Sequence, residues 1–554
     1  MTGPVDVVVV GLGAAGGVVA AQLALGGLHV LGIEAGGHLD RTQFPPDQLA
    51  TDMRAVLSSG KTRSECPTVR HSPDAVAEVP AQAALTMNAV GGTKHHSGNA
   101  HSRMPEWQFR SRTATVERYG REAIPPGSTL ADWPLSYADL APFYDEVEKL
   151  IGVSGDAEGN PFQGPRTGPY PLPPLRPAGY TELMAGAARD LGWHPFAAPA
   201  AIRSQPYRGL GGCTYCGHCV FNGCWADAKG VSSLSAIPPA VATGNLTVLT
   251  EARVVEVLVD ADGLASGVVY LKDGQRHEQH ARAVVLACFT YENVRLLLLS
   301  RSAAFPDGLS NRAGQVGRHF TTHQIGFSFG TFRGREMNTW TGAMSQATMV
   351  ADFDADNFDH TGLGFVGGGG LWAMMEKKVL AFSRTVPPSV PRWGSRYKRW
   401  LAEDFRSVGH INIIFDEQPN EGTLLDLDPT HTDDAGYPVI RITRAPSIGD
   451  DVAYGFLSGK AEEWLRAAGA TEAWSLPYIP FNVSPHAFGG ARMGNDASTS
   501  VVDSWCMSHE VPNLAVLGGA VFPSSTGSNP TPTIEALAWR TARHLVDGWA
   551  RIAA

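Results

Sequence analysis

Val5-Asp-Val-Val-Val-Val10-Gly11-Leu-Gly13-Ala-Ala-Gly16 is the stretch that decides the fold class of this chain. The β-branched run Val5–Val10 predicts a strand buried on both faces of a parallel sheet. Residues 11–16 predict a tight turn, residues 17–25 a helix, and residues 29–34 a second strand. This order of elements is a βαβ unit.

The three glycines of this turn have the spacing G-x-G-x-x-G. Gly11 permits the tight turn, Gly13 lets the backbone approach a pyrophosphate, and Gly16 lets the helix pack closely on the strand. The dipole of the helix favours negative charge at its N-terminus. Glu34 ends the second strand, where its carboxylate can accept hydrogen bonds from a ribose diol. The pattern predicts a dinucleotide site but does not distinguish FAD from NAD.

Composition narrows the class of protein. The chain has 554 residues, which predicts more than one domain, and 43% of them are hydrophobic, as in soluble globular proteins. The formal net charge is -10 and no block of basic residues occurs. Because phosphate binding needs clustered Lys and Arg, nucleic acid is excluded as the expected partner.

The apolar beginning of the chain lacks the features of a secretory signal. No Lys or Arg occurs before Arg41, so the positive segment of a signal peptide is missing. No window offers the roughly 20 apolar residues of a transmembrane segment. We therefore expect a cytoplasmic protein without a transmembrane segment, or one carried to the periplasm by a partner subunit.

The rest of the chain alternates irregular and periodic segments. A Pro-rich stretch from about residue 45 to 206 contains one clear helix, which follows the cap-like Ser136. Residues 310–480 hold alternating strands and predict a largely antiparallel sheet. The individual predictions are a helix at 137–150, an antiparallel meander at 246–259 and 265–271, a buried strand at 283–287 before a helix ending at 298, strands at 325–332, 410–415 and 514–517, and a helix at 533–549.

The C-terminal region carries specific motifs. His486-Ala-Phe-Gly-Gly-Ala-Arg-Met-Gly494 is followed by Gly518-Gly519-Ala520-Val-Phe-Pro523 and by Asn529-Pro530-Thr531-Pro-Thr533. These motifs resemble those of the glucose–methanol–choline (GMC) oxidoreductases, which are FAD enzymes. The segments Val90-Gly91-Gly92-Thr93-Lys-His-His96 and Tyr291-Glu-Asn-Val-Arg fit the same family.

The resemblance covers nearly the whole chain. It is closest to the flavin-bearing large subunits of gluconate, 2-ketogluconate and fructose dehydrogenases, and to glycoside 3-dehydrogenases. It implies an α/β fold with a Rossmann-like FAD-binding domain and a second, substrate-binding domain built on a largely antiparallel sheet. We assign residues 1–125, 205–305 and 482–554 to the FAD-binding domain, and residues 126–204 and 306–481 to the substrate-binding domain.

Two residues occupy the family's catalytic positions. His486 stands where the family has its catalytic His, and Asn529 where it has a partner His or Asn. Alcohol oxidation removes the hydroxyl proton while a hydride leaves the same carbon for flavin N5. An imidazole with a pKa near neutrality can accept that proton. A second polar group can orient the substrate and hold the developing alkoxide.

The resemblance also implies which residues bind the cofactor. Many relatives have an acidic residue near Gly518, and the small residues here match the sugar-acid dehydrogenase branch. In a few relatives a His near position 96 bonds covalently to the flavin, and His96 has His95 beside it, so covalent and non-covalent attachment both stay open. The expected cofactor contacts are Gly11, Gly13, Gly16, Glu34, Gly91, Gly92, Thr93, His96, Val254, Gly519, Ala520, Asn529 and Thr531.

Four of the seven cysteines crowd into one segment with the spacing C-x2-C-x2-C-x4-C: Cys213, Cys216, Cys219 and Cys224. Ferredoxin-type runs place thiolates at such short intervals around an iron–sulfur cluster. Similar segments in the dehydrogenase branch imply a [3Fe-4S] cluster that passes electrons to a haem partner. A structural zinc site and free or disulfide-linked cysteines are the alternatives.

These observations define the expected function. The chain is predicted to oxidise a secondary hydroxyl of a sugar, sugar acid or glycoside to a ketone. A small subunit and a cytochrome c acceptor are the partners that the resemblance implies. The alternatives are an oxygen-using glycoside or pyranose oxidase without a cluster, and a non-catalytic FAD electron-transfer subunit.

Overall fold

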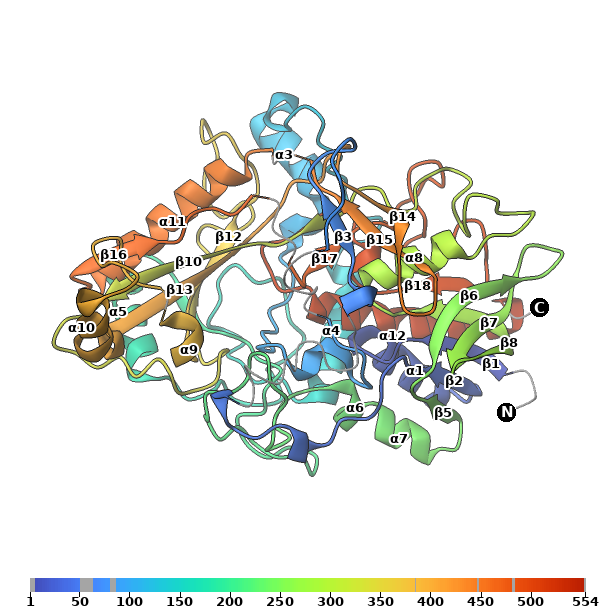
Figure 1. Ribbon diagram of the computed structural model, residues 1–554, viewed down its shortest axis with the longest axis horizontal. Coiled ribbons are helices and arrows are strands. Elements are labelled where there is room, and N and C mark those ends of the chain that lie inside the picture. The colour runs from blue at the N-terminus through green and yellow to red at the C-terminus, as the bar shows by residue number, and fades with distance from the viewer. Residues whose placement is uncertain are drawn as a thin grey trace.

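Two sheets lie at opposite ends of the long axis of the molecule, a seven-stranded one and a six-stranded one (Figure 1). The computed structural model describes residues 5–49, 63–79, 86–383, 385–445, 448–480 and 484–552. Within these ranges, no helix has both the length and the apolar character needed to cross a membrane.

The seven-stranded sheet contains the predicted βαβ unit. Its order is β5-β2-β1-β8-β7-β6, with β18 also paired to β8. The strands β5, β2, β1, β8 and β18 pair in parallel, and β6, β7 and β8 form an antiparallel meander. The strands are β1 (Val5–Val10), β2 (Val30–Ile33), β5 (Leu246–Leu249), β6 (Arg253–Val259), β7 (Ala265–Lys272), β8 (Gln275–Leu286) and β18 (Leu514–Val516).

One strand prediction in this region is wrong. Residues 246–259 were expected to form a single strand of the meander, but β5 pairs in parallel with β2, and only β6 belongs to the meander. The parallel pairing is reached through the short helices α6 (Ser232–Ser235) and α7 (Ile237–Ala242), which supply the crossover that parallel strands need.

Two helices bring their N-termini to the same edge of this sheet. Helix α1 (Ala14–Leu25) packs on α12 (Thr531–Asp547), the helix expected from residue 533, which begins two residues earlier. The close packing that the turn predicts at Gly16 is present, because a Cβ there would lie 1.7 Å from Gly11 O. A third helix, α8 (Thr290–Leu299), follows β8 as predicted.

The six-stranded sheet is antiparallel throughout, which confirms the expected second sheet. Its order is β16-β10-β13-β12-β11-β4, and helices α5 (Gly179–Asp190) and α11 (Asp450–Ala467) pack on it. The strands are β4 (Pro195–Ala197), β10 (Gln324–Thr331), β11 (Thr348–Val350), β12 (Gly369–Ala373), β13 (Val408–Phe415) and β16 (Glu472–Ser475). The domain boundaries given above stay a prediction.

Smaller elements connect the two sheets. One three-stranded sheet has the order β14-β15-β3, and one two-stranded sheet pairs β17 with β9. These strands are β3 (Thr68–Arg70), β9 (Thr321–Thr322), β14 (Leu424–Thr432), β15 (Pro438–Thr443) and β17 (Ala487–Phe488). The remaining α-helices are α3 (Ser111–Tyr119), α4 (Tyr137–Ile151), α9 (Val379–Phe382), α10 (Ser395–Glu403) and α13 (Trp549–Ile552).

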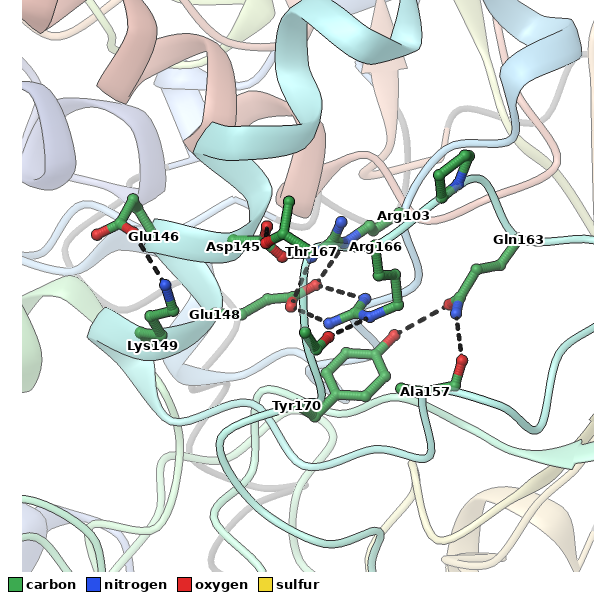
Figure 2. Close-up of polar contacts among 12 residues, drawn as sticks. Arg103, Asp145, Glu146, Glu148, Lys149, Ala157, Gln163, Arg166, Thr167 and Tyr170 are labelled. Atoms are coloured by element: carbon green, nitrogen blue, oxygen red, sulfur yellow. Dashed lines mark hydrogen bonds and ion pairs between the residues drawn. The ribbon is translucent and has the colours of Figure 1, made fainter.

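A buried ion-pair network anchors α4 (Figure 2). The Arg103 guanidinium donates from Nε and Nη2 to the two carboxylate oxygens of Glu148, both at 2.8 Å, and also pairs with Asp145. Arg166 donates to the same Glu148 carboxylate. Because these charges are paired and hydrogen-bonded, their burial is compensated. The network fixes α4, which packs on α12 and so on the nucleotide-binding half of the molecule.

Candidate active site

One cavity of about 950 Å³ collects most of the residues that the sequence singled out. It is lined by segments from the parallel sheet, from the C-terminal motifs and from strands β10 and β13 of the antiparallel sheet. The predicted site residues that line it are Gly11, Gly13, Glu34, Gly92, Thr93, His96, Val254, His486, Gly519, Asn529 and Thr531. Gly16, Gly91 and Ala520 lie outside this lining: Gly16 packs on Gly11, Gly91 N donates to Leu12 O, and Ala520 is fully buried.

Two helix N-termini face this cavity. In the described structure no side chain caps α1 at Gly13 or α12 at Pro530, and both residues line the cavity. Uncapped N-terminal amides and the helix dipole favour a phosphate at such a place. Glu34 is held at the end of β2, because its carboxylate accepts hydrogen bonds from Leu12 N at 2.8 Å and Gly36 N at 3.0 Å.

The nucleotide turn and the loop at residues 91–98 touch each other at two glycines. Gly92 has a φ of +60°, and a Cβ there would lie 2.8 Å from the Cα of Gly13. The two backbones therefore form one wall of the cavity that only glycine permits. This wall, the two open helix N-termini and Glu34 together form a cradle. The cradle fits an FAD molecule whose pyrophosphate lies on the nucleotide turn.

Two buried lysines fix the loop that follows Gly92. Lys94 Nζ is 2.5 Å from Glu535 Oε1 of α12, and both side chains are buried. Lys229 Nζ donates to four carbonyl oxygens: two of the loop, His95 O at 2.7 Å and Ser97 O at 2.8 Å, and two of the cysteine segment, Cys219 O at 2.6 Å and Asn222 O at 2.9 Å. The cysteine segment is thereby fixed against the loop that carries the expected cofactor contacts Gly92, Thr93 and His96.

The cysteine side chains do not lie in a metal-binding arrangement in the described part of the chain. Within the described residues, no group of three or more His, Cys, Asp or Glu side chains is arranged to hold a metal ion. Burial raises the pKa of the Cys213 thiol to about 11 and that of Cys219 well above its usual range. The iron–sulfur cluster therefore stays a prediction from the cysteine spacing and from the resemblance.

His486 lies beside a second histidine that the sequence did not reveal. The Nδ1 atoms of His486 and His323 are 2.9 Å apart, and the two rings are nearly perpendicular at 89°. Burial lowers the pKa of His486 to about 4, below the near-neutral value expected from the sequence, so the imidazole is neutral. Among the described residues nothing hydrogen-bonds its other ring nitrogen, Nε2, while the residue lines the cavity.

Two asparagine side chains leave hydrogen-bonding capacity open at the same cavity. The Oδ1 atoms of Asn529 and Asn412 are buried and have no partner in the described structure. A buried, unpaired polar atom is costly, which a bound hydroxyl group would remedy. Asn412 comes from β13 and is flanked in the lining by apolar residues: Ile325, Phe327, Ile414 and Leu476.

Comparison with known proteins identifies the family. Residues 180–325 match the N-terminal family model of the GMC oxidoreductases, and residues 460–538 match the C-terminal one. Gluconate 2-dehydrogenase flavoprotein from Pantoea cypripedii is 32% identical over 97% of this chain and 93% of its own length. The chain belongs to the GMC oxidoreductases, an FAD-binding family, and the resemblance stated from the C-terminal motifs is confirmed.

Two further relatives extend this result. Paromamine 6'-oxidase from Streptomyces fradiae is 30% identical over 97% of this chain and 90% of its own length. The crystal structure of pyridoxine 4-oxidase from Mesorbium loti has a TM-score of 0.60 and 18% identity, and the match covers 98% of this chain and 99% of that one. The predicted fold class is thereby confirmed, and the family includes both dehydrogenases and oxidases.

Sequence reasoning missed three residues of this site: His323, Lys229 and Asn412. His323 stands in Thr321-Thr-His-Gln324, where no motif marks it. Lys229 is a lone basic residue five positions after Cys224, and Asn412 lies in the mostly apolar strand His410–Phe415. A polar residue inside a mostly apolar strand was the one available signal, because a buried polar group needs a partner.

Proposed function

We propose that this GMC oxidoreductase oxidises a secondary hydroxyl of a sugar, sugar acid or glycoside to a ketone. His486 Nε2 accepts the hydroxyl proton, and the Asn529 amide holds the same hydroxyl group in place. Bound FAD supplies the two-electron acceptor that takes the hydride from the alcohol carbon. The observation that carries this proposal is one cavity in which the nucleotide turn, a neutral His486 and the unpaired Asn529 Oδ1 lie together.

The roles of the two side chains follow from their contacts. His486 Nδ1 is occupied by His323, so proton transfer falls to Nε2. General base catalysis of this kind contributes roughly 10²- to 10⁴-fold to a rate. Asn529 directly precedes Pro530, which is the residue before α12 begins. Its buried Oδ1 atom needs a hydrogen-bond donor. The Nδ2 group of Asn529 can donate to the oxygen of the reacting hydroxyl, and a neighbouring substrate hydroxyl can donate to Oδ1, so both contacts orient the substrate.

The lining of the cavity supports a sugar-like substrate. Asn412 offers a buried, unpaired acceptor, and the side chains around it from β10 and β13 are apolar. A sugar ring presents hydroxyl groups at its edge and C–H groups on its face, so it matches a polar atom set in an apolar wall. The names of the relatives, a gluconate dehydrogenase and a paromamine oxidase, agree with this substrate class.

The residues proposed to hold FAD are those of the cradle. Gly11, Gly13 and Thr531 would hold the phosphates at two helix N-termini, and Glu34 would accept hydrogen bonds from the ribose. Gly92, Thr93, His96 and Gly519 lie along the proposed flavin site, and Val254 lies along the proposed adenine site. Both covalent and non-covalent attachment through His96 remain compatible with its place in the lining.

The electron acceptor and partners belong to the proposal as well. A small subunit, a cytochrome c acceptor and the [3Fe-4S] cluster stay predictions from the resemblance and the cysteine spacing. The oxidase relative supports oxygen as the alternative acceptor. A cytoplasmic location, or periplasmic export with a partner, likewise stays a prediction.

An anaerobic titration of the purified holoenzyme tests the proposal. Sugars, sugar acids, alkyl glycosides and simple alcohols are added in turn, and flavin absorbance is followed. We expect one sugar-like compound to bleach the flavin and to yield a ketone detectable by NMR. If dithionite bleaches the flavin but no sugar-like compound does, the proposal is overturned. Oxygen uptake and iron content, measured on the same sample, assign the acceptor.

A further inference from the structure

His323 and His486 are held side by side by a two-stranded sheet. Strand β9 (Thr321–Thr322) pairs antiparallel with β17 (Ala487–Phe488), so each strand has a histidine at its end. His323 N donates to His486 O at 3.1 Å, which fixes the two backbones. The side chains then meet at 2.9 Å between their Nδ1 atoms.

The far side of His323 decides the position of its proton. Its Nε2 hydrogen-bonds the carbonyl oxygen of Thr526. Because a carbonyl can only accept, Nε2 of His323 carries the hydrogen. Burial, together with the neighbouring His486, holds the pKa of His323 well below its usual value, so the ring is neutral and its Nδ1 has no hydrogen.

The position of the ring hydrogen on His486 follows from its position on His323. A hydrogen bond between two nitrogens needs one donor and one acceptor. Since His323 Nδ1 can only accept, His486 Nδ1 must donate. Neutral His486 therefore carries its hydrogen on Nδ1, and its Nε2 keeps a free lone pair towards the cavity.

We propose that His323 is a positioning residue that selects this tautomer of His486 and so prepares Nε2 as the base. The inference rests on the proposed function. As the alcohol O–H bond breaks, an N–H bond forms at His486 Nε2, and the hydride leaves the same carbon for the flavin. The resulting imidazolium keeps its Nδ1 hydrogen bond to His323, which stabilises its positive charge. His323 keeps its own proton on Nε2.

The groups around His323 are compatible with a neutral imidazole ring. Its ring packs edge-on against Phe488, with centroids 5.0 Å apart. The carboxylate of Glu417 contacts the neighbouring residue of β9, accepting from Thr322 N, and is paired with the buried Arg444. No carboxylate contacts His323 among the described residues, so a neutral acceptor orients His486 without adding a negative charge to the cavity.

Two substitutions of similar size separate this role from simple packing. His323→Asn keeps an oxygen acceptor near the place of Nδ1, whereas His323→Leu has nearly the same shape as Asn but cannot accept. We expect His323→Leu to lower the rate constant of flavin reduction by roughly 100-fold, and His323→Asn to recover at least about a tenth of the wild-type rate. FAD content and melting temperature confirm that both variants are folded and loaded.

Nitrogen NMR of the ¹⁵N-histidine-labelled enzyme reads the tautomer directly, without turnover. His486→Ala identifies the signals of that residue. We expect wild-type His486 to carry its hydrogen on Nδ1 and His323→Leu to lose that preference. A wild-type His486 with its hydrogen on Nε2 overturns the inference, as does a folded, FAD-loaded His323→Leu enzyme with the wild-type rate. If His486→Ala itself keeps full activity, the proposed function fails first.

Discussion

The contact between Gly92 and Gly13 predicts a specific loss of FAD affinity. A methyl group added by Gly92→Ala would lie 2.8 Å from the Gly13 Cα and must push the loop and the nucleotide turn apart. Overpacking by one methyl group costs about 1–3 kcal/mol. If the FAD-free protein can relax and the FAD-bound one cannot, FAD binds about 5- to 150-fold more weakly.

The hairpin residue Gly274 provides a matched control. It also has a positive φ, +72°, but a Cβ there meets nothing within 4 Å. Gly274→Ala therefore imposes the same kind of backbone strain far from the nucleotide turn. After removal of FAD, fluorescence titration with FAD measures the dissociation constant of each variant. If Gly92→Ala binds FAD as tightly as Gly274→Ala, the two glycines do not form the wall described above.

Two further predictions concern buried charge. Glu148→Gln removes the carboxylate shared by Arg103 and Arg166 and should lower the free energy of unfolding by about 3–5 kcal/mol, whereas Glu146→Gln on the exposed face of α4 should change it by less than about 1 kcal/mol. Equal effects in urea denaturation would contradict this. Burial raises the pKa of Asp354 to about 6 from 3.8, so the native protein keeps a proton that the unfolded chain has lost. Stability should therefore fall by about 2 kcal/mol between pH 4 and pH 7, and Asp354→Asn should remove that part of the fall; parallel pH profiles would refute it.

The sequence patterns predicted those elements that are specified by residues within one short segment. The strand, turn and helix at residues 5–25 were recognised because glycine spacing and apolar runs act within one short segment. The cap at Ser136 was recognised for the same reason. The pairing of β5 with β2 joins segments about 200 residues apart, and no local pattern specifies such a partner. The apolar run of β5 suits a meander and a parallel sheet equally well.

The site shows the same limit. His486 and Asn529 were found because they stand in motifs of the GMC family. His323 was not found, since its importance comes from the pairing of β9 with β17 and from Thr526 O, which lies 203 residues away in the chain. The cysteine spacing predicted a cluster, but the fold places those side chains without a metal-holding arrangement in the described residues.

The role of His486 is tested most directly by the rate constant of anaerobic flavin reduction in His486→Ala. A sugar that bleaches the wild-type enzyme is mixed with the variant in a stopped-flow instrument, with FAD content checked by its spectrum. We expect the rate constant to fall by at least about 100-fold. The exposed His431→Ala should stay within about twofold of wild type. A His486→Ala enzyme that reduces its flavin as fast as His431→Ala would contradict the account.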